Sequence, residues 1–507
     1  MRIKQFSKRA IDSVKLIDIY LAKINGKAVQ VYSARNWKES FFVVSVWFVI
    51  ALSRALPEGI STKIPVLNMG NNASPENIRK GWGQGDAGSL LEIAISWANF
   101  KKLDPVTQYW IVHLWSPGLS ILEVPLIWIS RIGIPIFWSL LVITLTLWSI
   151  LFLLIWKHFS QLTGRIPMFV VFIGLLWSWD FTYLLKDYIF YTEGIGFSLL
   201  LIGLVLISIK CISPYPVSNK YMYLSGILIG FSIWIRHTNE SGLNLMFVLM
   251  CASYLISIRR TKYQSAKWKN KRKNTKKSIL LEAMNNIPKV FFRFGMISSG
   301  IALLVTLPWR LISTYYFQGA PFLMSSASGS VPSTIWSLPN SPSGQYWGPY
   351  GSNWACKIDL ETCNQVQSGI VDGTMSHNHL ILLAVKSILE NPLSYIQERS
   401  YYLWVNWIPN FSLEFSYQKI VALIFMVLPL YCLYLFLVVK DKRKYGVIIV
   451  WGSFLLMNLA QLGIIHYESR YFIPVRLFTL GLLLSLVCLR NASNQSDKSS
   501  QRIKASA

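Results

Sequence analysis

Charged residues are scarce in this chain. They make up 14% of its 507 residues, whereas a soluble protein of this length carries about a quarter. Hydrophobic residues make up 53%, and they gather in runs of roughly 17–25 residues, the length that a helix needs to cross a bilayer. The scarcity of charge excludes a soluble globular protein and predicts an all-α polytopic membrane protein.

Acidic residues are scarcer still: 23 Asp and Glu stand against 49 Lys and Arg, which gives a net charge of +26. Such a balance can indicate a nucleic-acid partner, but here the basic residues crowd into short segments between apolar runs. The segment from Arg259 to Lys277 holds ten of them and no acid. Cytosolic loops that touch anionic headgroups have this composition. The sequence therefore predicts contact with membrane lipid and no nucleic-acid partner.

Cysteine is rare, with six residues in the chain. Four lie in or beside apolar runs, where Cys behaves as a small hydrophobe. Cys356 and Cys363 lie in a polar loop that we place outside the cytosol, and the sequence leaves open whether they form a disulfide. Their spacing is not that of a metal-binding knuckle, and His377 and His379 are too sparse for a metal site. No metal or other cofactor is predicted.

The apolar runs predict about ten transmembrane helices with both termini in the cytosol, because every connection then assigned to the cytosol is basic. The first run follows a basic leader and resembles a signal-anchor. The predicted spans are Glu39–Leu56, Ile134–Trp156, Ile166–Tyr183, Ile189–Ile209, Tyr221–Ile235, Gly242–Ile258, Val290–Trp309, Lys419–Val439, Tyr445–Ile465 and Tyr471–Leu489.

This topology requires that the run Val112–Ser130 does not cross the membrane. Pro117, Glu123 and Pro125 interrupt it, so we predict a juxtamembrane or re-entrant helix. The predicted organisation is a basic amphipathic leader (1–38), a transmembrane module (39–310) with a first outer loop (57–133), an extracytoplasmic loop region with amphipathic helices (311–417), C-terminal transmembrane helices (418–489) and a cytosolic tail (490–507).

The first outer loop contains the stretch GDAGSLLEIA, in which Ser89 and Glu92 have the spacing of a capping box. This predicts a helix that starts at Ser89, with Asp86 in the turn before it, near the positive end of the helix dipole. Asp86 is either another N-terminal cap or a reactive carboxylate. Its place in an outer loop, between glycines, favours the second interpretation.

Cationic residues recur at the predicted outer membrane face. Arg470 and His466 lie in HYESRY, Arg310 in LPWR and Arg236 in IRHTNE. Each Arg alone can be a boundary anchor, but several on one face favour a lipid phosphate, whose oxygens match the guanidinium fork.

Acidic residues also lie near this boundary, where acids usually have a partner. Asp180, Asp187 and Glu193 can support an Arg such as Arg236, and Glu468 lies within HYESRY. We assign Asp187, Glu193 and Glu468 as supporting acids of the site.

Five motifs, in order along residues 40–490, resemble those of the GT-C superfamily of integral membrane glycosyltransferases. The resemblance is closest to the bacterial branch with the lipid A aminoarabinose transferase and the enzymes similar to dolichyl-phosphate-mannose–protein mannosyltransferases. The motifs are GDAGSLLEIA, HLWSPGLSILEVPL, IWIRHTNESGLNL, LPWRLISTYYFQGAP and HYESRYFIP.

The resemblance implies a GT-C-like fold in a bacterial inner (plasma) membrane, with the active site on the extracytoplasmic face. It implies that Asp86 is the base of an inverting transfer from a polyprenyl-phosphate-linked sugar to a hydroxyl of a lipid, glycan or protein in the cell envelope. Arg470 and Arg236, with help from His466 or Arg310, would hold the polyprenyl phosphate.

The chain departs from the family pattern at three places. Ala87 follows Asp86, so the Asp-Glu pair of the protein O-mannosyltransferases is missing, which argues against a protein acceptor of that kind. Ser116-Pro117 replaces a Pro-Pro, and Leu311 replaces an Asn. Three other functions stay open: a transporter or flippase of lipid-linked sugars, a glycan ligase or polymerase that uses diphosphate-linked donors, and a non-catalytic scaffold.

Overall fold

The computed structural model describes most of the chain, and every regular element in the described part is helical. The described residues are 38–53, 86–113, 115–134, 136–163, 184, 191–212, 218–269, 275–316, 336, 354–371, 377–407, 416–463 and 471–505.

The helices that follow residues 38–53, which are helical themselves, are α4 (Asp86–Ala98), α5 (Pro105–His113), α6 (Gly118–Ser130), α7 (Ile136–Thr163), α10 (Thr192–Ile212), α11 (Lys220–Ile235), α12 (Asn239–Lys269), α13 (Thr275–Leu311), α15 (Trp354–Ile358), α16 (Leu360–Val371), α17 (His377–Glu390), α18 (Pro392–Trp407), α19 (Ser416–Val438), α20 (Lys444–Leu462) and α21 (Phe472–Ala505). A π-helical turn, Ile312–Tyr316, extends α13.

Six helical segments in the described ranges are long and apolar enough to cross a membrane, which indicates a multi-pass membrane protein. They are Ile136–Ser160, Thr192–Ile212, Asn239–Arg259, Phe291–Tyr315, Lys444–Leu462 and Phe472–Ala492. Lys220–Ile235 and Val427–Val438 are apolar but shorter, and the predicted span Ile166–Tyr183 lies outside the described residues. The number of ten spans therefore stays a prediction.

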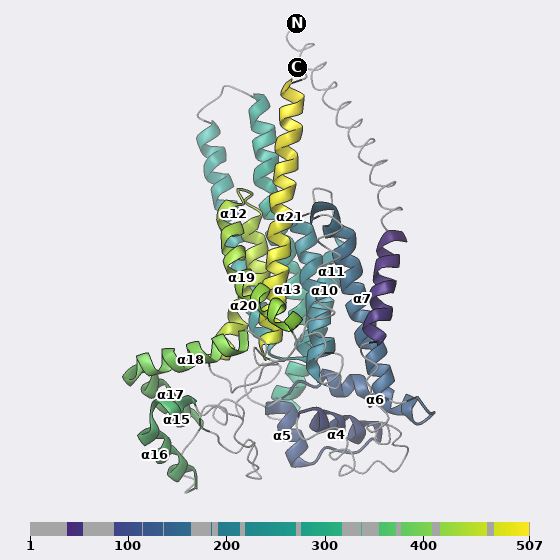
Figure 1. The fold of residues 1–507 in the computed structure, drawn as a ribbon, viewed down its shortest axis with the longest axis vertical. Coiled ribbons are helices and arrows are strands. Elements are labelled where there is room, and N and C mark those ends of the chain that lie inside the picture. The colour runs from purple at the N-terminus through teal and green to yellow at the C-terminus, as the bar shows by residue number, and fades with distance from the viewer. Residues whose placement is uncertain are drawn as a thin grey trace, which may run out of the picture.

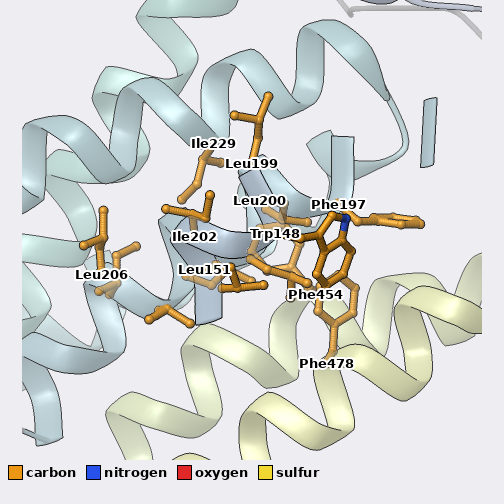
Figure 2. Close-up of a cluster of buried hydrophobic side chains, with 14 of the residues drawn as sticks. Trp148, Leu151, Phe197, Leu199, Leu200, Ile202, Leu206, Ile229, Phe454 and Phe478 are labelled. Atoms are coloured by element: carbon orange, nitrogen blue, oxygen red, sulfur yellow. The ribbon is translucent and has the colours of Figure 1, made fainter. Parts of the chain in front are cut away.

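Helix α10 lies at the centre of the bundle and is buried along almost its whole length. Figure 2 shows its side chains, among them Phe197 and Leu200, packed with Trp148 of α7, Phe454 of α20 and Phe478 of α21. These rings and aliphatic groups join helices that are far apart in the sequence into one core.

Helix α11 packs closely on α13 because it presents two glycines one turn apart, Gly226 and Gly230. A Cβ on Gly226 would lie 2.5 Å from the backbone oxygen of Ser298, and one on Gly230 would lie 2.6 Å from Cβ of Val305. This is the small-residue spacing by which membrane helices approach each other. The close packing sets the distance between the ends of α11 and α13, where Arg236 and Arg310 lie.

The bundle has two distinct ends (Figure 1). Helices α4, α5 and α6 and helices α15 to α18 gather at one of them, which we call the loop end. The extended parts of α12, α13 and α21 project from the other, which we call the basic end. Both predicted outer loops, 57–133 and 311–417, thus contribute helices to the same end.

The helices at the basic end are longer than predicted. We expected residues 259–289 to be a connection and 490–507 a tail, but α12 continues to Lys269, α13 begins at Thr275 and α21 reaches Ala505. Residues 259–277 and 490–505 contain neither Gly nor Pro and are rich in polar residues that a helix accepts. Loss of apolar character therefore marks the end of the span and not the end of the helix.

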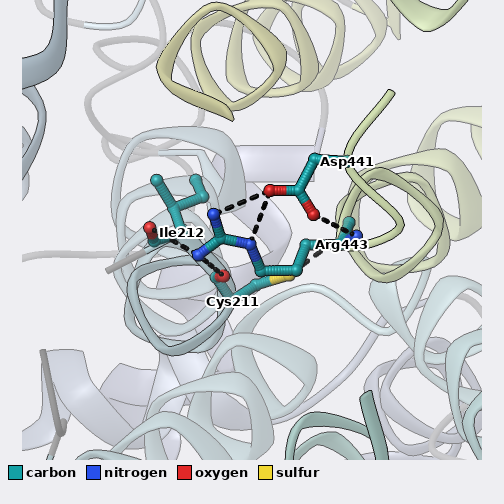
Figure 3. A network of polar contacts seen from close by, with 4 residues as sticks. All are labelled: Cys211, Ile212, Asp441 and Arg443. Atoms are coloured by element: carbon teal, nitrogen blue, oxygen red, sulfur yellow. Dashed lines mark hydrogen bonds and ion pairs between the residues drawn. The ribbon is translucent and has the colours of Figure 1, made fainter. Parts of the chain in front are cut away.

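A polar network ties α10 to the turn before α20 at the basic end (Figure 3). Arg443 Nη2 lies 2.7 Å from Asp441 Oδ2, and Arg443 Nη1 donates to the carbonyl oxygens of Cys211 at 3.4 Å and Ile212 at 3.3 Å. These carbonyls end α10 and have no partner within the helix. The arginine satisfies them and places a positive charge where the helix dipole is negative.

Candidate functional site

Helix α4 begins at Asp86 and lies on α6. The Ser120 hydroxyl donates to the Leu90 carbonyl at 2.8 Å, and Trp128 Nε1 donates to the Ala98 carbonyl at 3.0 Å. Buried apolar side chains of both helices, among them Leu91 and Ile127, pack between these two bonds. The helix whose first residue is Asp86 is thereby fixed at both of its ends.

The predicted capping box is wrong. Because α4 starts at Asp86, Ser89 lies inside the first turn and cannot be the residue that precedes the helix. Asp86 is itself the first helical residue, not part of a turn before the cap. Its side chain lies outside the described part of the structure, so its role stays a prediction.

Helix α6 in turn meets the end of α11. A Cβ on Gly118, the first residue of α6, would lie 2.4 Å from the carbonyl of Trp234, so only glycine allows this approach. Arg236 follows two residues after Trp234. The contact joins the platform that carries Asp86 to the segment that carries Arg236.

Arg236 forms a buried ion pair with Glu193, the second residue of α10. Arg236 Nη1 lies 2.8 Å from Glu193 Oε1 and donates to the Thr192 hydroxyl at 3.1 Å. The guanidinium also lies over the ring of Phe197, with its carbon 4.9 Å from the ring centroid. Only 1% of the surface of Glu193 and 9% of that of Arg236 is exposed to solvent. Burial at this level makes the pair a preorganised unit.

A second buried pair joins Arg310, near the end of α13, to Glu240 at the start of α12. Arg310 Nη2 lies 2.5 Å from Glu240 Oε1, and Arg310 Nε donates to the Thr306 hydroxyl one turn earlier at 2.8 Å. Both side chains are buried. Only the four residues 236–239 separate the C-terminal end of α11 from Glu240. The turn between α11 and α12 therefore carries one member of each pair.

The same turn holds polar atoms without hydrogen-bond partners. Arg236 Nε, Thr238 Oγ1 and both amide atoms of Asn239 are buried and unpaired. Burial, together with the charge of Arg236, lowers the pKa of His237 to about 4, so its imidazole is neutral at pH 7. Buried polar atoms normally find partners, and unpaired ones point to water or a ligand. The turn offers donors, an acceptor and a neutral imidazole to such a group.

All buried charged side chains of the described residues lie at the loop end. They are Glu123, Glu193, Arg236, Glu240, Arg310, Arg399 and Arg476. Arg399 donates to the carbonyl of Leu462 at the end of α20, and Arg476 donates to the carbonyl of Trp407 at 3.5 Å. Glu123 lies in α6, and neither of its carboxyl oxygens has a hydrogen-bond partner. Acidic and basic side chains held away from solvent at one end point to a functional site.

The structure brings three of the predicted site residues into this cluster. Arg236 and Glu193 contact each other, in agreement with the expectation that Glu193 supports an Arg such as Arg236, and Arg310 pairs with Glu240 beside the same turn. Asp187, His466, Glu468 and Arg470 lie outside the described residues. Their roles stay predictions.

Sequence reasoning missed four of these seven residues, Glu123, Glu240, Arg399 and Arg476, and it also missed Asn239. Glu240 and Asn239 were visible only as part of IRHTNE, and Glu123 was interpreted only as an interruption of an apolar run. The sequence did contain a signal for Glu123, because an acid inside the apolar sequence SILEVPLIW is costly to bury unless it has a partner or a functional role. No local signal distinguishes Asn239 from an ordinary turn residue.

Comparisons of the chain with models of protein families, with curated proteins and with solved structures found no match. No group of three or more His, Cys, Asp or Glu side chains that could hold a metal ion occurs among the residues that the structure describes. In the described ranges, fold and site together define a class: an all-α multi-pass membrane protein with buried acidic and basic side chains at the end of the bundle where α4 to α6 and α15 to α18 gather.

Proposed function

We propose that the protein is an inverting glycosyltransferase of the GT-C type, which moves a sugar from a polyprenyl-phosphate-linked donor to a hydroxyl of an acceptor in the cell envelope. The observation that carries the proposal is the clustering of every described buried charge at the loop end. A donor of this kind has an apolar tail for the bilayer and an anionic group for the membrane boundary. The cluster lies where these two parts of the donor would meet.

The transporter alternative is weaker, because moving a lipid-linked sugar across the bilayer calls for polar groups along the path. Among the described residues, charged side chains are buried only near the ends of spans, for example Glu193 at the start of α10 and Arg476 in the second turn of α21. The polar side chains buried further inside the described bundle, such as Ser225, Ser298 and Asn458, are uncharged. This arrangement suits a reaction at one face.

Ion pairing does not prevent the arginines from binding phosphate. A guanidinium has five N–H donors, and Glu193 and Thr192 are both contacted by Nη1 of Arg236. The Nε donor of Arg236 remains unpaired. In the proposed mechanism the carboxylate fixes the guanidinium, and the unpaired donor faces the charge that grows on the leaving phosphate. Arg310, and Arg470 with His466 from the HYESRY segment, would complete the phosphate site.

Asp86 is the proposed base. A hydroxyl acceptor is a weak nucleophile, and a fixed carboxylate takes its proton as the new sugar–oxygen bond forms. The N-terminus of α4 favours the ionised carboxylate that this role needs. One carboxylate suffices, because a single inversion forms no covalent glycosyl-enzyme intermediate.

The described disulfide supports an extracytoplasmic position for the loop end. Cys356 and Cys363 are bonded to each other and link α15 to α16. Disulfides of this kind belong to oxidising compartments such as the bacterial periplasm. With α4 to α6 at the same end, the proposed site faces outward in the inner membrane, and the basic end faces the cytosol.

The test compares lipid extracts from cells that lack the gene with extracts from cells that carry it. Complementation uses the unchanged gene, Asp86→Asn, and Asp441→Asn as a matched control at the opposite end of the bundle. We expect the Asp86→Asn strain to accumulate a polyprenyl-phospho-sugar and to lack one sugar on a glycan or lipid, as the deletion strain does. The Asp441→Asn strain should match the unchanged gene.

Two outcomes would overturn the proposal. If Asp86→Asn protein is produced at the normal level and restores the product, Asp86 is not the base. If the deletion strain accumulates a diphosphate-linked oligosaccharide, the reaction is that of a ligase or polymerase.

A further inference from the structure

Helices α17 and α18 carry a one-sided row of exposed aliphatic side chains. It consists of Leu382, Val385, Leu389, Leu393 and Ile396, which we call the aliphatic stripe. Leu389 and Leu393 are 75% and 80% exposed, and Leu382 and Ile396 are 65% and 57% exposed. Soluble surfaces rarely leave such a row open, so the stripe faces something other than water.

The stripe follows one face of each of the two helices. Its members are three or four residues apart, which keeps them on one side of a helix. Asn391 joins the two helices, because its N–H donates to the Ser387 carbonyl of α17 at 2.9 Å and its own carbonyl accepts from Tyr395 N of α18 at 3.1 Å. The stripe thus has two parts, one on α17 and one on α18, joined at Asn391.

The opposite face of α18 is already occupied by protein. The ring of Tyr395 packs on Trp354 of α15 with centroids 5.1 Å apart, and Glu398 pairs with Lys357 at 2.7 Å. Tyr402 packs on Phe472 of α21 with centroids 5.6 Å apart. With one face bound to protein, α18 has a fixed orientation and the stripe a fixed direction.

Helix α18 lies at the level where two spans end. The Tyr395 hydroxyl donates to the carbonyl of Gly463, directly after α20, and Arg399 donates to that of Leu462. Figure 1 shows α18 leaving the bundle sideways at this level, with α15 and α16 on its far side from the bundle. The candidate spans Lys444–Leu462 and Phe472–Ala492 end and begin there, so this level is the boundary of the bilayer.

We propose that the aliphatic stripe is inserted into the adjacent leaflet of the bilayer, so that α17 and α18 form an interfacial anchor for the 311–417 region. The fixed level of α18 supports a lipid surface as the occupant. Interfacial helices of this kind bury their apolar face about 5–10 Å below the headgroups. Lys386 and Glu390, an exposed pair on α17 with atoms 3.7 Å apart, would remain in water beside it.

The test is spin-label accessibility in the full chain reconstituted in phospholipid vesicles. The four free cysteines are replaced while the Cys356–Cys363 disulfide is kept, and single labels are placed at Leu393→Cys and Ile396→Cys. Glu390→Cys and Ser394→Cys are the controls, because each is an exposed polar position one residue after a stripe member, Leu389 and Leu393 respectively. Collisions with oxygen report lipid, and collisions with a water-soluble nickel chelate report water.

We expect oxygen collisions to exceed nickel collisions several-fold at the two stripe positions, and the reverse at the two control positions. Equal nickel access at all four positions would overturn the proposal in favour of an open aqueous surface. Low access of both reagents at the stripe would overturn it in favour of a covering protein. None of these results depends on the transfer reaction, so the two proposals fail separately.

Discussion

The loop end of the bundle buries seven charged residues, whereas the described charged residues at the basic end stay in contact with solvent. Arg236 and Glu193 are almost fully enclosed. Asp441 and Arg443 make an equally short ion pair but keep 18% and 21% of their side chains exposed. Burying a charge costs several kcal/mol even when it is paired. At the basic end, charged residues set the topology and cap helices without being buried. The burial of charges at the loop end therefore has another reason, which we take to be function.

The largest effect should come from breaking a pair at the loop end. Arg310→Met leaves the Glu240 carboxylate buried without its partner, which should lower the free energy of unfolding by about 3–5 kcal/mol. Thermal unfolding of the purified protein in detergent measures it. The double variant Arg310→Met/Glu240→Gln should regain most of the loss, and no regain would show that the two residues act independently.

The next effect concerns Glu123 and depends on pH. Burial raises the pKa of its carboxyl well above the ordinary value of 4.5, so between 4.5 and the raised value the folded protein holds a proton that the unfolded chain has lost. Stability should therefore fall as pH rises through that window, by about 1.4 kcal/mol per pH unit. Melting temperatures measured upward from pH 5 should show this slope. Glu123→Gln should remove it, and the exposed Glu361→Gln should leave it unchanged. A slope that survives Glu123→Gln would assign the dependence to another group.

A smaller effect is expected where α6 meets α11. Gly118→Ala places a Cβ against the backbone of Trp234, and overpacking of this kind costs about 1–3 kcal/mol. Gly300→Ala in α13 is the control, because its Cβ would have no atom within 4 Å, and it should stabilise by about 0.5–1 kcal/mol. Because α6 supports α4, Gly118→Ala should also reduce transfer. Full activity would separate the α6–α11 contact from the site.

The smallest effect is expected at the basic end. Arg443→Ala removes the ion pair with Asp441 and the bonds to the end of α10, but water can replace these contacts at a partly exposed site. The loss should be about 1 kcal/mol, with no change in transfer. Thermal unfolding measures this loss of stability, with Lys440→Ala, a change at an exposed residue, as the control. A loss as large as that of Arg310→Met would end the contrast between the two ends.

The features of the fold that depend on composition were predictable. The length and apolar character of runs such as Ile134–Trp156 and Tyr471–Leu489 can be read directly from the sequence, and both runs correspond to described candidate spans. Helix ends were harder to predict. A capping signal at Ser89 was overridden by a helix that starts at Asp86, and basic segments continued α12 and α21 beyond the bilayer.

The site was only partly predictable, because ion pairs between distant segments leave no local pattern. The nearness of Arg236 to an acid could be anticipated from the position of Glu193 at the membrane boundary. The partner of Arg310 could not, since Glu240 lies 70 positions earlier in the chain and the pair depends on how α11 packs on α13. Asn239 gained significance only when its burial and missing partners became visible.

The disulfide between Cys356 and Cys363 has one more consequence. It lies within a small core of its own, where Trp354 and Cys363 pack with Val366 and Leu380, apart from the main core of the bundle. Under the proposed topology, this part of the chain completes its covalent structure only after it reaches an oxidising compartment. The redox state of two sulfur atoms in the purified protein is thus a direct record of the side of the membrane on which α15 and α16 matured.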